Sequence, residues 1–216
     1  MGVHPQRMFT LCWSPKGGSG TTVAAATLAL NATTSVLIDL AGDAPAALGV
    51  SAGSEGILDW MRSDTDPLRL DDLCIEIDSD HHLICAGRPG SVPARRWAVL
   101  ADHLASIDAS DVVVDAGTIN RPPNVLSERA DRRLMVLRPC YVALRRAHES
   151  AVVPDGVILL DEPGRALTAT DVERCIGAPV LAEVMVDPSV ARAVDAGLLA
   201  VRAPRSLIPI AKLAAS

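Results

Sequence analysis

A short apolar run followed by a glycine-rich loop is the feature that most constrains how this chain can fold. Residues 8–13 are apolar, the loop at 14–22 reads Ser-Pro-Lys-Gly-Gly-Ser-Gly-Thr-Thr, and residues 22–31 have the composition of a helix. Closely spaced glycines let several backbone N–H groups converge on one anion, because no Cβ atom blocks the approach. The first turn of a helix adds further free N–H groups. The segment therefore predicts a strand, a phosphate-binding loop and a helix, in that order.

The composition predicts one cytoplasmic domain that spans residues 1–216. Hydrophobic residues make up 49% of the chain and aromatic residues 2%, so the core has to be built from Ala, Val, Leu and Ile. A net charge of −6 argues against a protein that coats nucleic acid with its whole surface. The five cysteines are scattered without a Cys-x-x-Cys pair, which indicates free thiols in a reducing compartment. We find no secretion signal and no apolar run of about 20 residues, so we expect no integral membrane segment.

Short apolar runs alternate with helix-like segments along the chain. Strands are predicted at residues 8–13, 35–38, 82–85, 111–114, 133–137, 156–160 and 179–184. Helices are predicted at residues 22–31, 93–106, 141–152, 170–176 and 188–196. Several runs are apolar throughout, so we expect an α/β fold with a doubly wound, mostly parallel sheet that helices flank on both faces. We expect residues 51–80 to form one or two short helices with loops, and residues 206–216 to pack on the domain.

Two acidic residues follow apolar strands at positions where a ligand is expected. Asp39 ends the run Val-Leu-Ile, and Asp115 ends the run Val-Val-Val. In open α/β sheets, ligands bind beyond the carboxyl ends of the strands. These carboxylates could hold Mg²⁺ directly or through water, with the Thr22 hydroxyl as a further ligand. Either aspartate could instead be a turn or cap residue, and Arg138 at another strand end could border the same pocket or a partner surface.

These positions together resemble the ParA/MinD family of P-loop NTPases, which has a deviant Walker A motif. The family's loop reads Lys-Gly-Gly-x-Gly-Lys-Ser/Thr, and the chain matches it at Lys16, Gly17, Gly18, Ser19, Gly20 and Thr22. The strand ends at Asp39 and Asp115 are similar to the family's two acidic strand ends. Residues 182–197 are similar to its segment beside the adenine. The resemblance covers nearly the whole chain.

The resemblance implies a site for ATP and Mg²⁺. The phosphates would lie against the loop, at Lys16, Gly17, Gly18, Ser19, Gly20, Thr21 and Thr22. Asp187 and Pro188 would lie beside the adenine. The metal would be held by Thr22, Asp39 and Asp115, and hydrolysis would involve Lys16, Asp39 and Asp43. Lys16, one of two lysines in the chain, would also reach across a nucleotide-sandwich homodimer to the phosphates of the partner.

Two departures from the family pattern predict that nucleotide binding is retained better than hydrolysis. Thr21 replaces the second lysine of the loop and supplies no charge, which could weaken phosphate binding by about 2–4 kcal/mol. Ala41 stands where the family has a second acidic residue, and nearby Asp43 could substitute for it. Loops without the second lysine resemble those of the TadZ/CpaE-type branch, which localises pili, and a septum-site relative would look similar.

We therefore expect a homodimeric ATP-binding protein that positions or recruits a cellular machine (pilus, division or partition) through an unidentified protein partner, with weak or absent hydrolysis. Two alternatives stay open: a pseudo-ATPase scaffold that binds no nucleotide, and an active partition ATPase that binds DNA. Non-specific DNA binding would use a local group of arginines, namely Arg129, Arg132, Arg133, Arg145 and Arg146. The acidic net charge favours internal ion pairs for these arginines instead.

Overall fold

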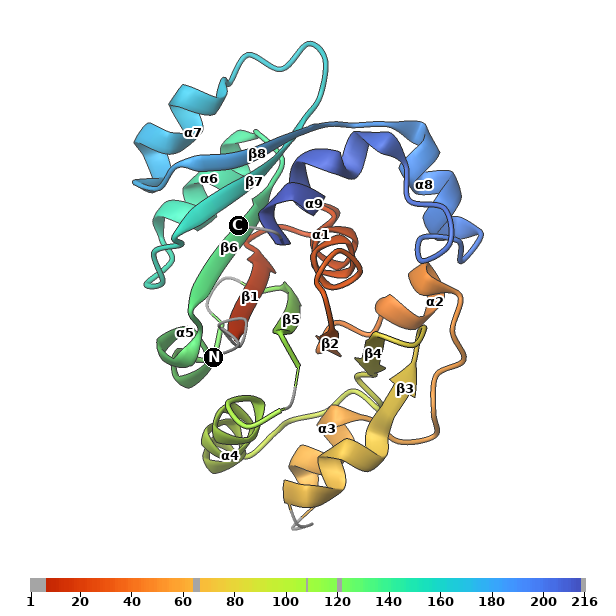
Figure 1. Ribbon diagram of the computed structural model, residues 1–216. Coiled ribbons are helices and arrows are strands. Elements are labelled where there is room, and N and C mark those ends of the chain that lie inside the picture. Colours follow the sequence, from red (N-terminus) through yellow and green to blue (C-terminus); the bar gives the residue numbers. More distant parts are fainter. Residues whose placement is uncertain (1–6, 64–66, 108, 120–121, 215–216) are drawn as a thin grey trace, which may run out of the picture.

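One twisted sheet organises the chain. A computed structural model describes residues 7–63, 67–107, 109–119 and 122–214, and within them eight strands form this sheet (Figure 1). The strands are β1 (Met8–Ser14), β2 (Ser35–Asp39), β3 (Cys74–Glu76), β4 (His81–Ile84), β5 (Asp111–Thr118), β6 (Arg132–Leu137), β7 (Gly156–Asp161) and β8 (Val180–Met185). Their order is β3-β4-β2-β5-β1-β6-β7-β8, and every neighbouring pair is parallel except β3 and β4. The predicted doubly wound, mostly parallel sheet is confirmed.

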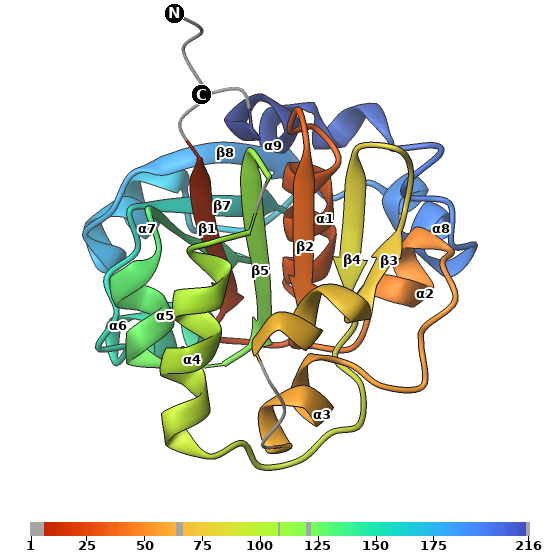
Figure 2. The same ribbon diagram turned by 60° about the horizontal axis from the view of Figure 1, so that its bottom comes forward.

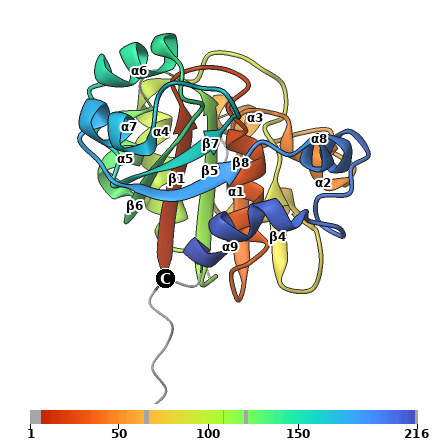
Figure 3. The ribbon, with the colours of Figure 1, turned by 90° about the horizontal axis from the view of Figure 1, so that it is seen from above.

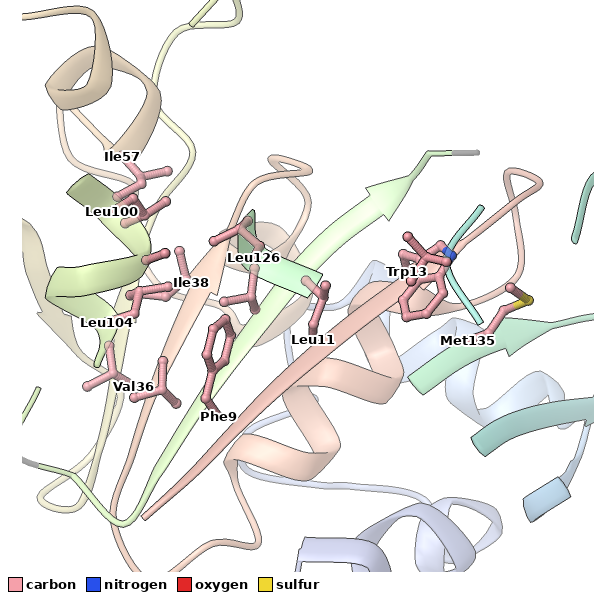
Figure 4. Close-up of a cluster of buried hydrophobic side chains, with 14 of the residues drawn as sticks. Phe9, Leu11, Trp13, Val36, Ile38, Ile57, Leu100, Leu104, Leu126 and Met135 are labelled. Carbon is pink, nitrogen blue, oxygen red and sulfur yellow. The ribbon is translucent and has the colours of Figure 1, made fainter. Parts of the chain in front are cut away.

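The inner strands are apolar throughout because successive side chains enter two separate cores. On β1, Phe9, Leu11 and Trp13 belong to one hydrophobic cluster, whereas Cys12 belongs to the other. Strands β2, β5, β6 and β7 alternate in the same way. Figure 4 shows the first cluster, in which strand side chains meet Ile57 and Leu100 from the helices that cover this face. In a strand that is buried on both faces, nearly every side chain enters a hydrophobic core, which explains the continuous apolar runs.

Helices cover both faces of the sheet. The first face carries α3 (Ile57–Arg62), α4 (Ala94–Leu104), α5 (Asn124–Arg129), α6 (Tyr141–His148) and α7 (Ala169–Ile176), with α3, α4 and α5 in front of the sheet in Figure 2. The second face carries α1 (Thr21–Ala29), α2 (Ala44–Leu48), α8 (Pro188–Asp195) and α9 (Ile208–Ala214). Helix α9 packs against α1 and β8 with Ile210 buried, so the predicted packing of the C-terminal segment is confirmed. Within the described residues, none of the helices combines the length and the apolar character that a membrane span requires.

The structure contains elements that the sequence pattern did not reveal. Residues 51–80 form α3 and a 3₁₀ helix (Pro67–Leu73), as predicted, but they also contain β3, which pairs antiparallel with β4. Helices α2, α5 and α9 are five to seven residues long, too short to show a helical repeat. Helix α5 begins directly after Pro123.

The strand order brings the carboxyl ends of β1, β2 and β5 together. Strand β5 lies between β1 and β2, with Asp115 opposite both Cys12 and Asp39 in the register. From β1 the chain winds first toward β2 and β4, and later through β6 toward β8. Ligands of doubly wound sheets bind where the winding direction changes, so this edge is the expected site.

A close approach between two glycines fixes α2 against the segment that follows α8. Gly49 ends α2 with a left-handed backbone (φ 74°), and a Cβ atom on it would overlap the carbonyl oxygen of Gly197. The N–H of Leu199 donates to the carbonyl of Ala47 at 3.2 Å in the same contact. Only glycine leaves room for the two backbones to meet here.

We expect Gly49→Ala to destabilise the fold more than a matched substitution does. Gly177 ends α7 with nearly the same backbone (φ 78°), but a Cβ atom there would meet no atom within 4 Å. Gly177→Ala should cost only the left-handed strain of about 1 kcal/mol, whereas Gly49→Ala should cost about 3 kcal/mol because α2 and Gly197 must separate. Urea denaturation of both variants measures the difference, and equal losses would contradict the close-approach argument.

Candidate functional site

The glycine-rich loop forms an open turn that hydrogen bonds of its own side chains hold in place. The hydroxyls of Ser14 and Ser19 both donate to the carbonyl of Lys16, at 2.8 and 2.7 Å. Gly18 and Gly20 have left-handed backbones, with φ of 72° and 76°, and Gly20 is the N-cap of α1. L-residues rarely adopt this conformation, so the glycines are required by the turn. Ser19 therefore shapes the loop through its hydroxyl as well as lining the site.

The backbone N–H groups of the loop face a cavity. Within the described part of the chain, the amides of Gly18, Gly20, Thr21 and Thr22 form no hydrogen bond with another group of the protein. A cavity of about 640 Å³ lies against them. It is lined by Gly18, Ser19, Gly20, Thr21, Thr22, Val23, Leu40, Ala41, Asp43, Ala46, Ala47, Ala116, Gly117, Thr118 and Val194. Unpaired amides around an open space at a helix N-terminus are an anion site.

A second, mostly apolar cavity of about 390 Å³ continues around the N-terminus of α1. It shares Gly18, Gly20, Val23 and Val194 with the first cavity. Its remaining lining comes from the ends of β6, β7 and β8, from α8 and from the C-terminal segment, and includes Arg138, Leu160, Val184, Asp187, Pro188, Val190 and Ile210. The structure thus joins a hollow rich in N–H donors to an apolar hollow, and Asp187 and Pro188 lie in the second one.

Asp187 acts as the N-cap of α8. Its Oδ1 accepts from the N–H of Ser189 at 2.8 Å, and its Oδ2 accepts from the hydroxyls of Ser189 and Ser206 at 2.6 and 3.0 Å. These bonds, led by the one from the Ser189 hydroxyl, lower the pKa of Asp187. The residue therefore positions the wall of the apolar cavity.

Asp39 shapes the turn that leads into α2. The carboxylate is fully buried, and its Oδ1 accepts from the amides of Ala41 and Gly42 at 2.8 and 2.7 Å. Its Oδ2 accepts from the amide of Ala44 at 3.0 Å. Burial raises the pKa of Asp39, while the three amide bonds oppose that shift. This is the turn-residue role that the sequence left open, and both carboxylate oxygens are occupied.

Asp115 has an unused oxygen. Its Oδ1 accepts from the amide of Gly117 at 2.8 Å, but its buried Oδ2 forms no hydrogen bond with any described residue. Burial raises the pKa of Asp115 from 3.8 to about 6, although the neighbouring Thr22 hydroxyl favours the charged form. An orphaned carboxylate oxygen beside a hydroxyl suits Mg²⁺, a hard cation that prefers oxygen ligands and keeps several waters. Among the described residues, no three His, Cys, Asp or Glu side chains are placed to enclose a metal ion.

Asp43 and Ala41 border the first cavity beside the β5 end. Asp43 is the N-cap of α2, but its exposed carboxylate makes no capping bond and lines the cavity. Ala41 faces Gly117 so closely that a Cβ atom on that glycine would lie 2.8 Å from the Cβ of Ala41. The position that carries an acidic residue in the family pattern is thus occupied by a methyl group, and Asp43 is the next carboxylate along the chain.

Lys16 does not line the cavity of its own loop. Gly17 and Lys16 lie outside the linings of both cavities. The Lys16 charge instead acts on Glu162, whose pKa is lowered mainly by Arg165 and further by Arg138 and Lys16. Arg138 lines the apolar cavity and pairs with Glu162 at 3.1 Å (Nη1 to Oε1), so it borders the site as the sequence suggested.

The five arginines considered for DNA binding all have partners within the protein. Three form ion pairs: Arg129 with Asp102, Arg133 with Asp155 and Arg145 with Glu149. The other two donate to backbone carbonyls, Arg132 to Leu213 at 2.6 Å and Arg146 to Pro15 at 3.4 Å. The arrangement agrees with internal pairing rather than with a free basic surface.

Sequence reasoning missed the small and aliphatic side chains that close the two cavities. Ala46, Ala47, Thr118, Leu160 and Val194 come from four separate segments. None of them belongs to a motif. The sequence indicates only that these residues lie at the end of a strand or on a helix. The order of the strands has to be known before such positions can be assigned to the cavities.

We expect Asp115→Asn to stabilise the metal-free protein at neutral pH. Because folding raises the pKa of this carboxyl from 3.8 to about 6, the folded state binds the proton more tightly than the unfolded state. Stability therefore declines as the pH rises through that interval. Asparagine keeps the acceptor for Gly117 and carries no charge, so unfolding should cost about 2 kcal/mol more at about pH 7.5 and nearly the same near pH 4.

Urea denaturation at both pH values measures this effect. Glu128→Gln removes an exposed charge from α5 and serves as the control. A gain for Asp115→Asn that is equal at both pH values would show that the charge of the carboxylate is not its cause.

The sequence matches no protein-family model and no curated protein, but the fold has well-matched solved counterparts. A ParA family ATPase from Chlorobium tepidum is 20% identical, with a TM-score of 0.77 over 97% of this chain and 99% of that one. The septum site-determining protein MinD of Pyrococcus horikoshii, complexed with Mg-ADP, is 16% identical, with a TM-score of 0.73 over 97% and 95%.

A third counterpart is MinD of Aquifex aeolicus in its complex with MinC, which is 18% identical with a TM-score of 0.74 over 95% and 94%. Sequence identities at this level show the fold alone. The shared fold extends over almost the full length of each pair of chains. The chain therefore has the P-loop NTPase fold of the ParA and MinD ATPases, with its glycine-rich loop at the carboxyl end of the central strand.

Proposed function

We propose that the chain is a member of the ParA/MinD family that binds ATP with Mg²⁺ in the two joined cavities. The observation that carries the proposal is the set of unpaired loop amides around an open cavity that continues into an apolar hollow. The first cavity suits a phosphate chain, and the second suits a planar base. The Mg-ADP in the similar MinD structure supports this assignment.

Thr22 and Asp115 are the residues that would hold Mg²⁺. Bound Mg²⁺ neutralises charge on the phosphate oxygens. The Thr22 hydroxyl and the orphaned Asp115 oxygen supply oxygen donors, and Asp39 holds the adjoining turn through its three amide bonds. Asp39 would contribute to the metal site mainly by holding this turn, and its negative charge would favour the bound cation.

We propose that hydrolysis is weak or absent. Thr21 is buried at the wall of the first cavity and offers a hydroxyl where the family has an ammonium. Ala41 offers no group that could orient water, so Asp43 is the carboxylate left for that task. The amides bind the phosphates of substrate and product alike, and uniform binding of this kind does not accelerate a reaction.

We propose a homodimer in which each Lys16 completes the site of the other subunit. Lys16 lies next to the loop but outside its own cavity, near Glu162 on the open edge. A cation placed in this way can reach the phosphates of a facing copy. The second subunit then supplies the charge that Thr21 lacks, so assembly depends on nucleotide.

Such a dimer would position or recruit a cellular machine through a protein partner, as the MinC-bound MinD structure illustrates for a similar fold. The missing second lysine favours the TadZ/CpaE-type branch. The five cysteines of the chain are free thiols, which supports a cytoplasmic location for the proposed ATP-binding protein.

Titration with a fluorescent ATP analogue tests the nucleotide proposal. We expect saturable binding with a dissociation constant below about 1 mM that tightens when Mg²⁺ is present. Thr21→Lys restores the charge at the cavity wall and should tighten binding by about 10- to 100-fold. Thr33→Lys places the same charge at the opposite end of α1 and should have little effect. Absence of saturable binding would leave the nucleotide-free scaffold, and a Thr21→Lys variant without any gain would mean that the loop does not contact phosphate.

Sedimentation velocity with and without Mg-ATP tests the role of Lys16. Lys16→Ala should weaken the ATP-dependent dimer by about 30-fold or more, because the phosphates of the facing subunit lose their cation. Binding of ATP to the isolated monomer should change much less. Lys212→Ala, which removes an exposed lysine from α9, is the control. A dimer that forms equally without nucleotide and survives Lys16→Ala would support the scaffold instead.

A further inference from the structure

Three of the arginines whose side chains the structure describes form neither a hydrogen bond nor an ion pair. The other arginines in this part of the chain interact with carboxylates, backbone carbonyls or other groups of the protein. Arg192, Arg202 and Arg205 form no hydrogen bond or ion pair with any described residue. Unpaired guanidinium groups in a chain of net charge −6 are available to bind an anionic ligand.

These three arginines line one hollow. Its volume is about 570 Å³, and its other lining residues are Ser189, Ala193, Leu198, Ala203 and Pro204. No carboxylate belongs to this lining. Asp187 interacts with Arg192 through space while its own oxygens are bound by Ser189 and Ser206, and Asp195 is the other acidic residue of α8. The hollow is therefore a concentrated positive site.

Exposed aliphatic side chains accompany the basic hollow. Leu198, which lines it, is 40% exposed, Val201 is 80% exposed and Ile208 is 48% exposed. The N–H groups of Val201 and Arg202 both donate to the carbonyl of Leu198, at 3.2 and 2.8 Å, so these residues share one tight turn. Figure 3 shows α8 and the loop after it at one side of the molecule, away from α6 and α7.

We propose that this surface binds a membrane of anionic phospholipids, with phosphate head groups in the arginine-lined hollow and Leu198 and Val201 at the acyl boundary. Guanidinium groups bind phosphate in a planar, two-pronged manner. Basic and aliphatic side chains on one protruding segment are the combination that holds a protein at the surface of a bilayer. A nucleic acid would satisfy the arginines, but exposed aliphatic side chains gain nothing against a sugar-phosphate backbone.

The hollow is separate from the nucleotide site. Helix α8 lies between the two: Pro188, Val190 and Val194 line the apolar cavity, whereas Ser189, Arg192 and Ala193 line the hollow. The proposal therefore does not rest on the proposed function, and substitutions in the hollow should leave nucleotide binding intact.

Co-sedimentation of the full chain with vesicles tests the proposal. The vesicles contain phosphatidylcholine alone or phosphatidylcholine with phosphatidylserine. Each basic side chain near an anionic surface favours binding about fivefold, so the triple variant Arg192→Gln/Arg202→Gln/Arg205→Gln should bind the anionic vesicles about 100-fold more weakly. The matched triple variant Arg129→Gln/Arg145→Gln/Arg174→Gln removes the same charge from exposed, ion-paired positions and should bind like the unaltered protein. Val201→Asp should weaken binding while leaving the arginines in place.

Two outcomes would overturn the proposal. One is equal binding of the unaltered protein to both kinds of vesicle, or an equal loss in the two triple variants. The other is tight binding of a duplex oligonucleotide that the hollow variant loses while anionic vesicles are not bound, which would assign the hollow to nucleic acid. Circular dichroism of each variant confirms that it is folded, so a loss of binding can be read as a loss of contacts.

Discussion

A parallel sheet buried on both faces is the constraint on which the rest of this structure depends. Side chains of β1 enter two hydrophobic clusters alternately, and helices must cover both of them. Parallel strands joined by helices place all their carboxyl ends at one edge, where loops and helix N-termini gather. The edge at β1, β2 and β5 therefore concentrates backbone N–H groups and carboxylates without any further arrangement. The site follows from this packing.

The edge that we propose binds phosphate is built mainly from backbone groups. Side chains of Ser14 and Ser19 hold the loop through the Lys16 carbonyl, and Asp39 holds the next turn through three amides. No lysine or arginine lines the first cavity among the described residues: Thr21 lies at its wall, and Lys16 lies outside its lining. Amide dipoles can bind an anion without charge, but they bind it less strongly than an ammonium group does. A second subunit is the simplest source of the missing charge.

Helix α8 is the element that separates the two candidate binding surfaces. One side of it forms a wall of the apolar cavity, and the other side carries Arg192 into the basic hollow. Its N-cap, Asp187, ties it to Ser206 in the C-terminal segment, and the Gly49–Gly197 contact ties the residues after it to α2. Helix α8 is therefore held at its N-cap and by the segment that follows it, and it presents a different side to each hollow.

The sequence by itself determined the class of fold, the glycine-rich loop and the acidic residues at the neighbouring strand ends. Continuous apolar runs require strands buried on both faces, and Gly18 and Gly20 require left-handed turns, so these features follow from local chemistry. The antiparallel β3, the short helix α2 and the aliphatic cavity walls at Leu160 and Val194 did not follow, because each is fixed by contacts with distant segments. Tertiary structure alone decided that both oxygens of Asp39 accept from amides while one oxygen of Asp115 has no hydrogen bond, although both residues end apolar strands in the same way. The tertiary structure also decided which arginines form ion pairs. Arg129 and Arg133 pair with carboxylates that are more than 20 residues away in sequence, so no local sequence pattern predicts these pairs.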